Sequence, residues 1–273
     1  MLNTIFQRNP HEAKRLSHKR LAVIGCGSVG SCFADVAVRA GIASFCLIDP
    51  DVLAPENLSR HILRGHDLGT SKAAGVAEAI RAVNPEAKVE VVVGKFTDLE
   101  EKPDLILAAT DSFFCQSKAN DYALRQNVPA IFAGCWGEAS VGEVYFVLPG
   151  QSACLECFAH FRRDKVEIPV SQERYTNPDH DTSRVPGQAG LWANILMTSA
   201  LAFQVALGIL DPENVRARLI DPERNLLLFN ISDFDSGLQN LAVTRGRVVK
   251  GCAVCDESKL AELGKNLETS LRS

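Results

Sequence analysis

The chain has 273 residues, of which 46% are hydrophobic and 23% charged, and its formal net charge is −4. These values are typical of a globular protein with a large core, and the mild acidity without a Lys/Arg block argues against nucleic-acid binding. The first twenty residues carry charges where a secretory signal needs an apolar stretch, so we expect a cytoplasmic protein.

Between residues 20 and 134, short apolar runs alternate with helical stretches. Nearly continuous apolar runs are typical of strands that helices cover on both faces. The succession predicts an α/β fold with a doubly wound, mostly parallel, Rossmann-like sheet. The expected strands are 20–25, 45–49, 88–93, 104–109 and 129–134, and the expected helices are 30–40, 70–83 and 113–126.

After residue 135 the pattern favours antiparallel strands. One is expected at 141–148, and a further pair within 218–230, joined by a turn that contains Pro. Residues 160–187 are polar and aperiodic, which predicts a mobile loop.

The segment 191–210 has twenty residues without a charge, which meets the length criterion for a membrane span. Polar residues such as Asn194 and Gln204 interrupt it, and no basic cluster flanks it. We therefore expect a buried core helix or a dimer-interface helix, and no membrane contact.

A glycine pattern, GCGSVG at 25–30, lies between the first strand and the helix after it. Gly25 permits a tight turn, Gly27 lets a phosphate approach the backbone, and Gly30 allows close helix packing. Asp49, at the end of the second strand, is placed to bond ribose hydroxyls. These residues predict a nucleotide site, but they do not distinguish NAD from ATP.

Two stretches that follow, DPDVLAPENLSRH (49–61) and LGTSK (68–72), add cations at the carboxyl edge of the sheet. Arg60 and Lys72 can neutralise phosphate charge, and Asn57 can bond phosphate or ribose. An NAD dehydrogenase has little use for these groups, whereas a nucleotidyl transferase needs them. Each residue alone is more often a solvated surface group.

The stretch AATDS at 108–112 ends another apolar strand, which places Asp111 at the same edge. A carboxylate there suits Mg²⁺, which takes one or two carboxylates together with phosphate oxygens. The alternative is a helix N-cap, a position that Asp also favours.

Four of the nine cysteines form two CxxC pairs, CLEC (Cys154 and Cys157) and CAVC (Cys252 and Cys255). Four thiolates in two such knuckles match a closed structural zinc site, with a redox pair as the alternative. The other cysteines are scattered, and the apolar surroundings of Cys32 and Cys46 predict small core residues. They are Cys26, Cys32, Cys46, Cys115 and Cys135.

Together, GCGSVG, LIDPD, ENLSRH, DLGTSK, AATDS and the CxxC pairs resemble the ThiF/MoeB/HesA superfamily of ubiquitin-activating-like adenylyltransferases. The resemblance implies an adenylation domain at 20–256, an N-terminal segment at 1–19 and a tail at 257–273. It also implies an enzyme that binds MgATP and adenylates the C-terminal carboxylate of a ubiquitin-like or sulfur-carrier protein ending in Gly-Gly. Such proteins dimerise, so the resemblance implies a homodimer, with a conjugating partner or fused module also open.

By position, the resemblance gives each site residue a role. It implies that Asp49 and Asp51 bind the nucleotide and that Asp111 holds Mg²⁺. It further implies that Asn57, Arg60 and Lys72 contact the phosphates, the two cations stabilising the transition state. Arg8 is the candidate for an arginine that relatives supply across the dimer to the neighbouring ATP.

The sequence departs from the family pattern in one respect that bears on the reaction. Many members carry a cysteine after the first CxxC that forms a thioester, but no cysteine lies between Cys157 and Cys252. We therefore expect adenylation without that thioester. The alternatives are a non-protein acceptor such as a tRNA base, a peptide acceptor, or a non-catalytic scaffold subunit. Among pathways, bacterial ubiquitin-like conjugation is favoured over sulfur transfer for molybdopterin or thiamin synthesis.

Overall fold

The computed structural model describes residues 2–136, 139, 141–159, 190–214, 220–230, 241–244, 252 and 254–255. The expected mobile loop at 160–187 and the tail at 257–273 lie outside the described residues.

Five parallel strands form the first half of the sheet, and each confirms an apolar run expected from the sequence. In four of them buried side chains lie on both faces, because helices or packed segments cover both, whereas the third along the chain, at the edge of the sheet, is only partly buried. The strands are β1 (Arg20–Ile24), β2 (Ser44–Ile48), β3 (Lys88–Val92), β4 (Leu105–Ala108) and β5 (Ala130–Trp136).

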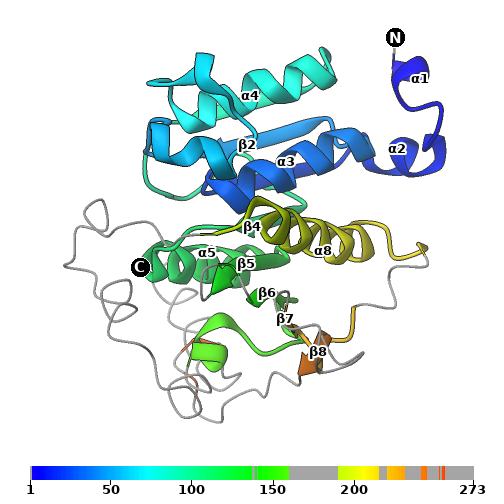
Figure 1. Cartoon of the computed structure of the whole chain (residues 1–273). Helices are drawn as coiled ribbons and strands as arrows, with labels where there is room; N and C mark the ends of the chain where they lie inside the picture. Colours follow the sequence, from blue (N-terminus) through cyan, green and yellow to red (C-terminus); the bar gives the residue numbers. More distant parts are fainter. Residues whose placement is uncertain are drawn as a thin grey trace, which may run out of the picture.

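Three antiparallel strands complete the sheet, so the prediction of antiparallel C-terminal strands is confirmed. They are β6 (Val141–Val147), β7 (Leu226–Asn230) and β8 (Leu241–Thr244). Across the described residues the order of strands is β3-β2-β1-β4-β5-β6-β7-β8 (Figure 1).

The expected strand pair within 218–230 is wrong in its pairing. The second strand of the expected pair is β7, and it pairs along one edge with β6 and along the other with β8. The first strand of the expected pair begins within 215–219, which lie outside the described residues. β8 was missed because its four-residue run carries no distinctive alternation.

Helices cover the sheet on both sides. α3 (Ser28–Ala40) packs against α4 (Lys72–Val83) and α8 (Trp192–Leu210), and Figure 1 shows the three side by side over one face. α5 (Phe113–Gln126) covers the other face together with the segment that contains Cys154 and Cys157. The nucleotide-type loop and the cysteine pairs are thus attached to one continuous sheet.

α8 is the uncharged helix expected at 191–210, and by length and composition alone it could cross a membrane. Its inner side chains are buried against α3, β5 and β6, and Ser199 Oγ donates to the carbonyl of Val29 at 3.1 Å. Its outer face leaves Leu196 and Met197 exposed. The helix thus contributes to the core and also offers an apolar outer surface.

The N-terminal segment forms two short helices, α1 (Leu2–Ile5) and α2 (Pro10–Leu16), that the sequence did not predict. Asn9 Nδ2 donates to the carbonyl of Arg39 at 3.0 Å, next to the last residue of α3. Gly41, at φ +110°, leaves room for Ala13, with whose backbone an added Cβ would clash. The segment is therefore anchored at the C-terminal end of α3.

Candidate active site and metal centre

The glycine loop after β1 turns tightly toward α3. Gly25 has φ +88°, and a Cβ there would come within 2.6 Å of the carbonyl oxygen of Ala109. A Cβ on Gly30 would clash with the carbonyl oxygen of Gly25. Both positions therefore require glycine, as the sequence predicted.

Gly27 differs from its neighbours because no atom among the described residues lies within 4 Å of where its Cβ would be. It is the N-cap of α3 and provides no side-chain cap for the N–H groups of the first turn. A helix start with uncapped N–H groups, approachable at a glycine, is the local structure that binds phosphate.

Asp49, at the end of β2, fixes the shape of this loop. Its carboxylate accepts from the backbone N–H of Cys26 at 2.6 Å and from that of Asp51 at 2.8 Å. Burial raises the pKa of Asp49, while these hydrogen bonds and the charge of Lys72 act in the opposite direction. Each carboxylate oxygen keeps a lone pair that could accept from a ribose hydroxyl.

Lys72 begins α4 and reaches the same edge of the sheet. Its Nζ donates to Asp51 Oδ2 at 2.8 Å, and its backbone N–H donates to the Asp51 carbonyl at 2.9 Å. The Lys72 side chain is 12% exposed, whereas that of Asp51 is 61% exposed. The ammonium group is therefore held in place by an acid on the solvent side.

Asn57 and Arg60 lie on η1 (Pro55–Arg60), a 3₁₀ helix. Asn57 Oδ1 accepts from the backbone N–H of Ala54 at 3.0 Å, which fixes the start of the helix. Arg60 ends the helix and is half-buried. Asn57 thus has a structural task in addition to any nucleotide contact.

Asp111 follows β4, and its electrostatic neighbours are Asp51, Lys72 and Arg60. Partial desolvation by surrounding protein atoms raises the pKa of Asp111 and so does the charge of Asp51, while the two cations act in the opposite direction. The N-cap of α5 is Ser112, whose Oγ accepts from Cys115 N at 3.3 Å. The N-cap alternative for Asp111 is therefore wrong.

His61 connects the glycine loop with the segment after η1 through hydrogen bonds. The sequence did not predict this role, although the motif ENLSRH contains the residue. It is buried, its Nε2 lies 2.8 Å from the Cys26 carbonyl, and its Nδ1 accepts from Leu63 N at 3.1 Å. This pattern requires a neutral ring with the proton on Nε2. Burial lowers the pKa of His61, consistent with that neutral form.

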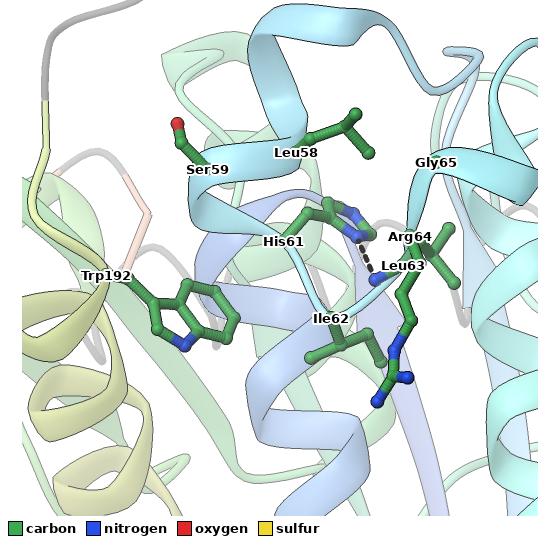
Figure 2. A pocket seen from close by; sticks show the side chains of 8 residues that line it. All are labelled: Leu58, Ser59, His61, Ile62, Leu63, Arg64, Gly65 and Trp192. Carbon is green, nitrogen blue, oxygen red and sulfur yellow. Dashed lines mark hydrogen bonds between the residues drawn. The ribbon is translucent and has the colours of Figure 1, made fainter.

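A pocket of about 400 Å³ lies beside His61, between η1 and the start of α8. In Figure 2 the side chains of Trp192 and Arg64 lie on opposite sides of it. Its lining is Leu58, Ser59, His61, Ile62, Leu63, Arg64, Gly65 and Trp192. The sequence patterns did not predict this pocket.

The two CxxC pairs meet on the α5 face of the sheet, although they are far apart in the chain. All four sulfur atoms lie within 4.8 Å of one another. Individual S···S distances are 3.9 Å for Cys154–Cys157, 3.8 Å for Cys154–Cys252 and 3.4 Å for Cys157–Cys255. A tetrahedral zinc with Zn–S of about 2.3 Å requires S···S of about 3.8 Å, so the residues fit the metal.

Buried polar groups hold the first pair in position. The Tyr145 hydroxyl donates to the carbonyls of Ala153 at 2.6 Å and Cys154 at 2.9 Å, and Asn225 Nδ2 donates to Ala153 at 3.0 Å. The knuckle shape is thus supported by the protein itself.

The scattered cysteines do not join this cluster. Cys32 and Cys46 are buried core residues, as predicted. Cys135, at the end of β5, lies 3.1 Å from Thr198 Oγ1, and burial raises its pKa. Its thiol is therefore held in the protonated, weakly nucleophilic form.

Comparison with known proteins identifies the family of the chain. A model described as the ThiF family matches residues 3–245. The chain belongs to the ThiF family. The family prediction made from the motifs is thereby confirmed.

Two curated relatives and one group of solved structures are similar to the chain. The sulfur carrier protein ThiS adenylyltransferase of Bacillus subtilis is 30% identical over 156 residues, 54% of this chain and 46% of the relative. Ubiquitin-like modifier-activating enzyme 5 of Drosophila melanogaster is 24% identical over 212 residues, 71% of this chain and 52% of the relative. The chain spans about half the length of these curated relatives.

E. coli MccB shares the fold. Its structure with ATP has a TM-score of 0.67 at 18% identity and covers 89% of this chain and 68% of MccB. Its structure with MccA has a TM-score of 0.69 at 18% identity and covers 93% and 74%. The fold prediction, a mostly parallel sheet with antiparallel C-terminal strands, is confirmed.

The predicted nucleotide residues therefore separate into two groups. Most of them gather at the carboxyl edge of β1, β2 and β4 with the starts of α3 and α4. Arg8 does not, because its segment is anchored at the other end of the 13-residue α3, about 20 Å along the helix axis. The gathered residues are Gly25, Gly27, Gly30, Asp49, Asp51, Asn57, Arg60, Lys72 and Asp111.

Proposed function

We propose that the protein uses MgATP to adenylate the C-terminal carboxylate of a small ubiquitin-like or sulfur-carrier protein that ends in Gly-Gly. The observation that carries the proposal is that Arg60, Lys72, Asp51 and Asp111 share one electrostatic neighbourhood beside an uncapped helix N-terminus. Two named adenylating and modifier-activating relatives support the same conclusion.

The chemistry is a displacement at the α-phosphate. A carboxylate oxygen of the carrier forms a bond to the α-phosphorus, the bond to the oxygen that bridges to the β-phosphorus breaks, and pyrophosphate leaves. The attacking carboxylate is already ionised, so the step needs no general base. Catalysis then depends on orienting the two anions and stabilising the charge that develops on the phosphates.

Residues of this chain supply those effects. The first turn of α3 would bind phosphate at Gly27, and Asp49 would accept from the ribose. Lys72 and Arg60 would neutralise the developing charge, and Asp111 would hold Mg²⁺, which supplies further positive charge on the phosphates.

We also propose that the reaction stops at the adenylate. The half-buried Cys135 thiol has a raised pKa, because the surrounding protein desolvates it, which disfavours a thioester at that position. Four thiols of the CxxC pairs would be occupied by structural zinc.

A cytoplasmic homodimer is the proposed assembly. Leu196 and Met197 on α8 and Leu191, just before it, are exposed apolar residues that support a protein contact. Because Arg8 lies at the far end of α3 from its own glycine loop, it would act on the site of the second protomer.

The test is Mg²⁺-dependent ATP–pyrophosphate exchange with a panel of carriers that end in Gly-Gly. We expect exchange with one carrier, and losses of about 10²-fold or more in Asp111→Ala and Arg60→Ala. Arg39→Ala is the matched control, because Arg39 pairs with Asp35 at 2.8 Å near the opposite end of α3. ATP binding without exchange would favour a peptide or tRNA acceptor or a scaffold, and no ATP binding would overturn the proposal.

A further inference from the structure

Four successive peptide groups in the glycine loop each make a hydrogen bond within the protein. Backbone groups supply two of the partners, and the carboxylate of Asp49 supplies a third. These bonds run from Gly25 N to Ile48 O at 2.8 Å, from Cys26 N to Asp49 Oδ2 at 2.6 Å, and from Ser31 N to Gly27 O at 2.9 Å. The remaining peptide group joins Cys26 to Gly27, and its carbonyl accepts from His61 Nε2 at 2.8 Å. A side chain from another segment therefore fixes this part of the loop.

The peptide group between Cys26 and Gly27 needs such a contact because a glycine follows it. Gly27 has no Cβ, so the peptide plane could rotate about the flanking backbone bonds at little steric cost. The peptide is planar and trans, so the Cys26 carbonyl and the Gly27 N–H point in opposite directions. Because that carbonyl points at the buried ring of His61, the Gly27 N–H points away from the ring.

The direction of this peptide group determines what the loop offers to a phosphate. Gly27 is the N-cap of α3, and no described atom lies within 4 Å of the position of an added Cβ. Anions at a helix start are attracted by N–H groups and repelled by carbonyl oxygens. A rotated peptide would present a carbonyl oxygen where the loop now presents an N–H group. The hydrogen bond from His61 prevents that rotation.

The ring of His61 is itself fixed on its other side. Its Nδ1 accepts from Leu63 N–H at 3.1 Å, and both residues are buried. His61 directly follows Arg60, the predicted phosphate-contacting cation at the end of η1. The same ring therefore connects two parts of the candidate nucleotide site.

We propose that His61 is a positioning residue of the nucleotide site, which orients the Gly27 N–H toward the phosphates of ATP by holding the Cys26 carbonyl. In this role His61 acts through the loop and not by contact with the nucleotide. The role rests on the proposed use of ATP, and it is the same for every acceptor.

Two substitutions separate the two hydrogen bonds of the ring. A glutamine amide extends as far as Nε2 and can donate to the Cys26 carbonyl. An asparagine amide extends only as far as Nδ1 and can accept from Leu63 N–H alone. We expect His61→Asn to weaken ATP binding, measured by calorimetry, by about tenfold, and His61→Gln to stay within about threefold of the original chain.

The matched control is His66→Asn, because the side chain of His66 is 77% exposed in the same segment. Its ATP affinity should equal that of the original chain. A purely structural role of His61 would lower stability and leave the ATP affinity of the folded protein unchanged. Equal ATP affinities of His61→Asn and His61→Gln would therefore overturn the positioning role.

A double-mutant cycle tests whether His61 acts through the loop. Gly27→Ala should itself weaken ATP binding, because its Cβ would occupy the space for phosphate. If His61 acts through the Gly27 N–H, His61→Asn should weaken binding much less in the Gly27→Ala protein than in the original chain. Equal losses in the two proteins would contradict that route.

A measurement on the original chain decides the matter if His61→Asn does not fold. Addition of ATP should move the amide proton resonance of Gly27 downfield and slow its hydrogen exchange, because this N–H donates to phosphate. An unchanged Gly27 amide at saturating ATP would overturn the positioning role and leave ATP binding intact. Failure of the original chain to bind ATP would instead overturn the proposed function, and the positioning role with it.

Discussion

Lys72 and Asp51 are joined twice, through an ion pair at 2.8 Å between their side chains and a backbone hydrogen bond at 2.9 Å. The backbone contact places the start of α4 beside the end of β2, and the side-chain contact keeps the ammonium group at the candidate nucleotide site. Asp111 and Arg60 share this electrostatic neighbourhood. A triphosphate would therefore meet cations that are already held in place.

Lys72→Met should separate catalysis from stability. We expect the exchange rate to fall by about 10²–10³-fold, because a cation that stabilises the transition state is lost. The free energy of unfolding should change by less than about 1 kcal/mol, since the partner Asp51 stays in water. Urea unfolding and exchange assays measure both, and equal losses in stability and activity would contradict this prediction.

Alanine substitutions at two glycines of the loop should affect different properties, one the stability of the fold and the other the binding of ATP. Gly30→Ala should destabilise the fold by about 3 kcal/mol, because its Cβ would meet the Gly25 carbonyl. Gly27→Ala should cost less than about 1 kcal/mol, since its Cβ would meet no described atom within 4 Å. It should nevertheless weaken ATP binding about tenfold, about 1.4 kcal/mol, by occupying the space for phosphate.

Urea unfolding and calorimetric ATP binding check the glycine pair. If Gly27→Ala binds ATP as well as the original chain does, phosphate does not approach the backbone at this position.

His61 should make stability depend on pH. Its folded pKa lies below the unfolded value of 6.5, because burial disfavours the charged ring and Lys72 and Arg60 add to this, against Cys26 and Asp67. The unfolded chain therefore binds the proton more readily. Stability is fully present above about pH 6.5 and decreases as the pH falls toward the folded pKa.

The measurement is the free energy of unfolding against pH in the original chain and in His61→Gln, which should be less stable but should lack this part of the slope. His66→Gln is the control, because the side chain of His66 is 77% exposed. Identical slopes in the original chain and His61→Gln would show that His61 does not titrate as inferred.

Removing one thiol should release the metal. We expect Cys255→Ser to lose bound zinc and at least about 2 kcal/mol of stability, because metal binding contributes to the folded state alone. Cys115→Ser should keep the metal, since Cys115 is outside the four-cysteine group. Elemental analysis with thermal unfolding decides this, and a metal-free original chain would contradict it.

Much of the fold could be predicted because the relevant signals are local. Nearly continuous apolar runs identified β1 to β5, and glycine and CxxC spacing identified the loop and the candidate metal ligands. The partner of β7 could not be predicted, because strand pairing depends on contacts between distant segments. Short helices such as α1 and α2 carry too few residues for a clear period.

The site was predicted less completely for the same reason. Nothing in the spacing of His61 indicates that its ring bridges Cys26 and Leu63, since that depends on how two loops pack. Likewise, Asn120 looks like an ordinary helix residue until Leu155 is seen to donate to it. In both cases the sequence identified the segment, but the contacts of one side chain within it required the fold.

The most direct test of the proposed adenylation traces the α- and γ-phosphates of ATP. The protein, a carrier that supports exchange, and Mg²⁺ are incubated with ATP labelled at either the α- or the γ-phosphate, and the carrier is isolated without hydrolysis. Adenylation predicts that the α-label appears on the carrier as an acyl-adenylate while the γ-label leaves as pyrophosphate. Release of the γ-label as inorganic phosphate, with ADP as product and no α-label on the carrier, would contradict it.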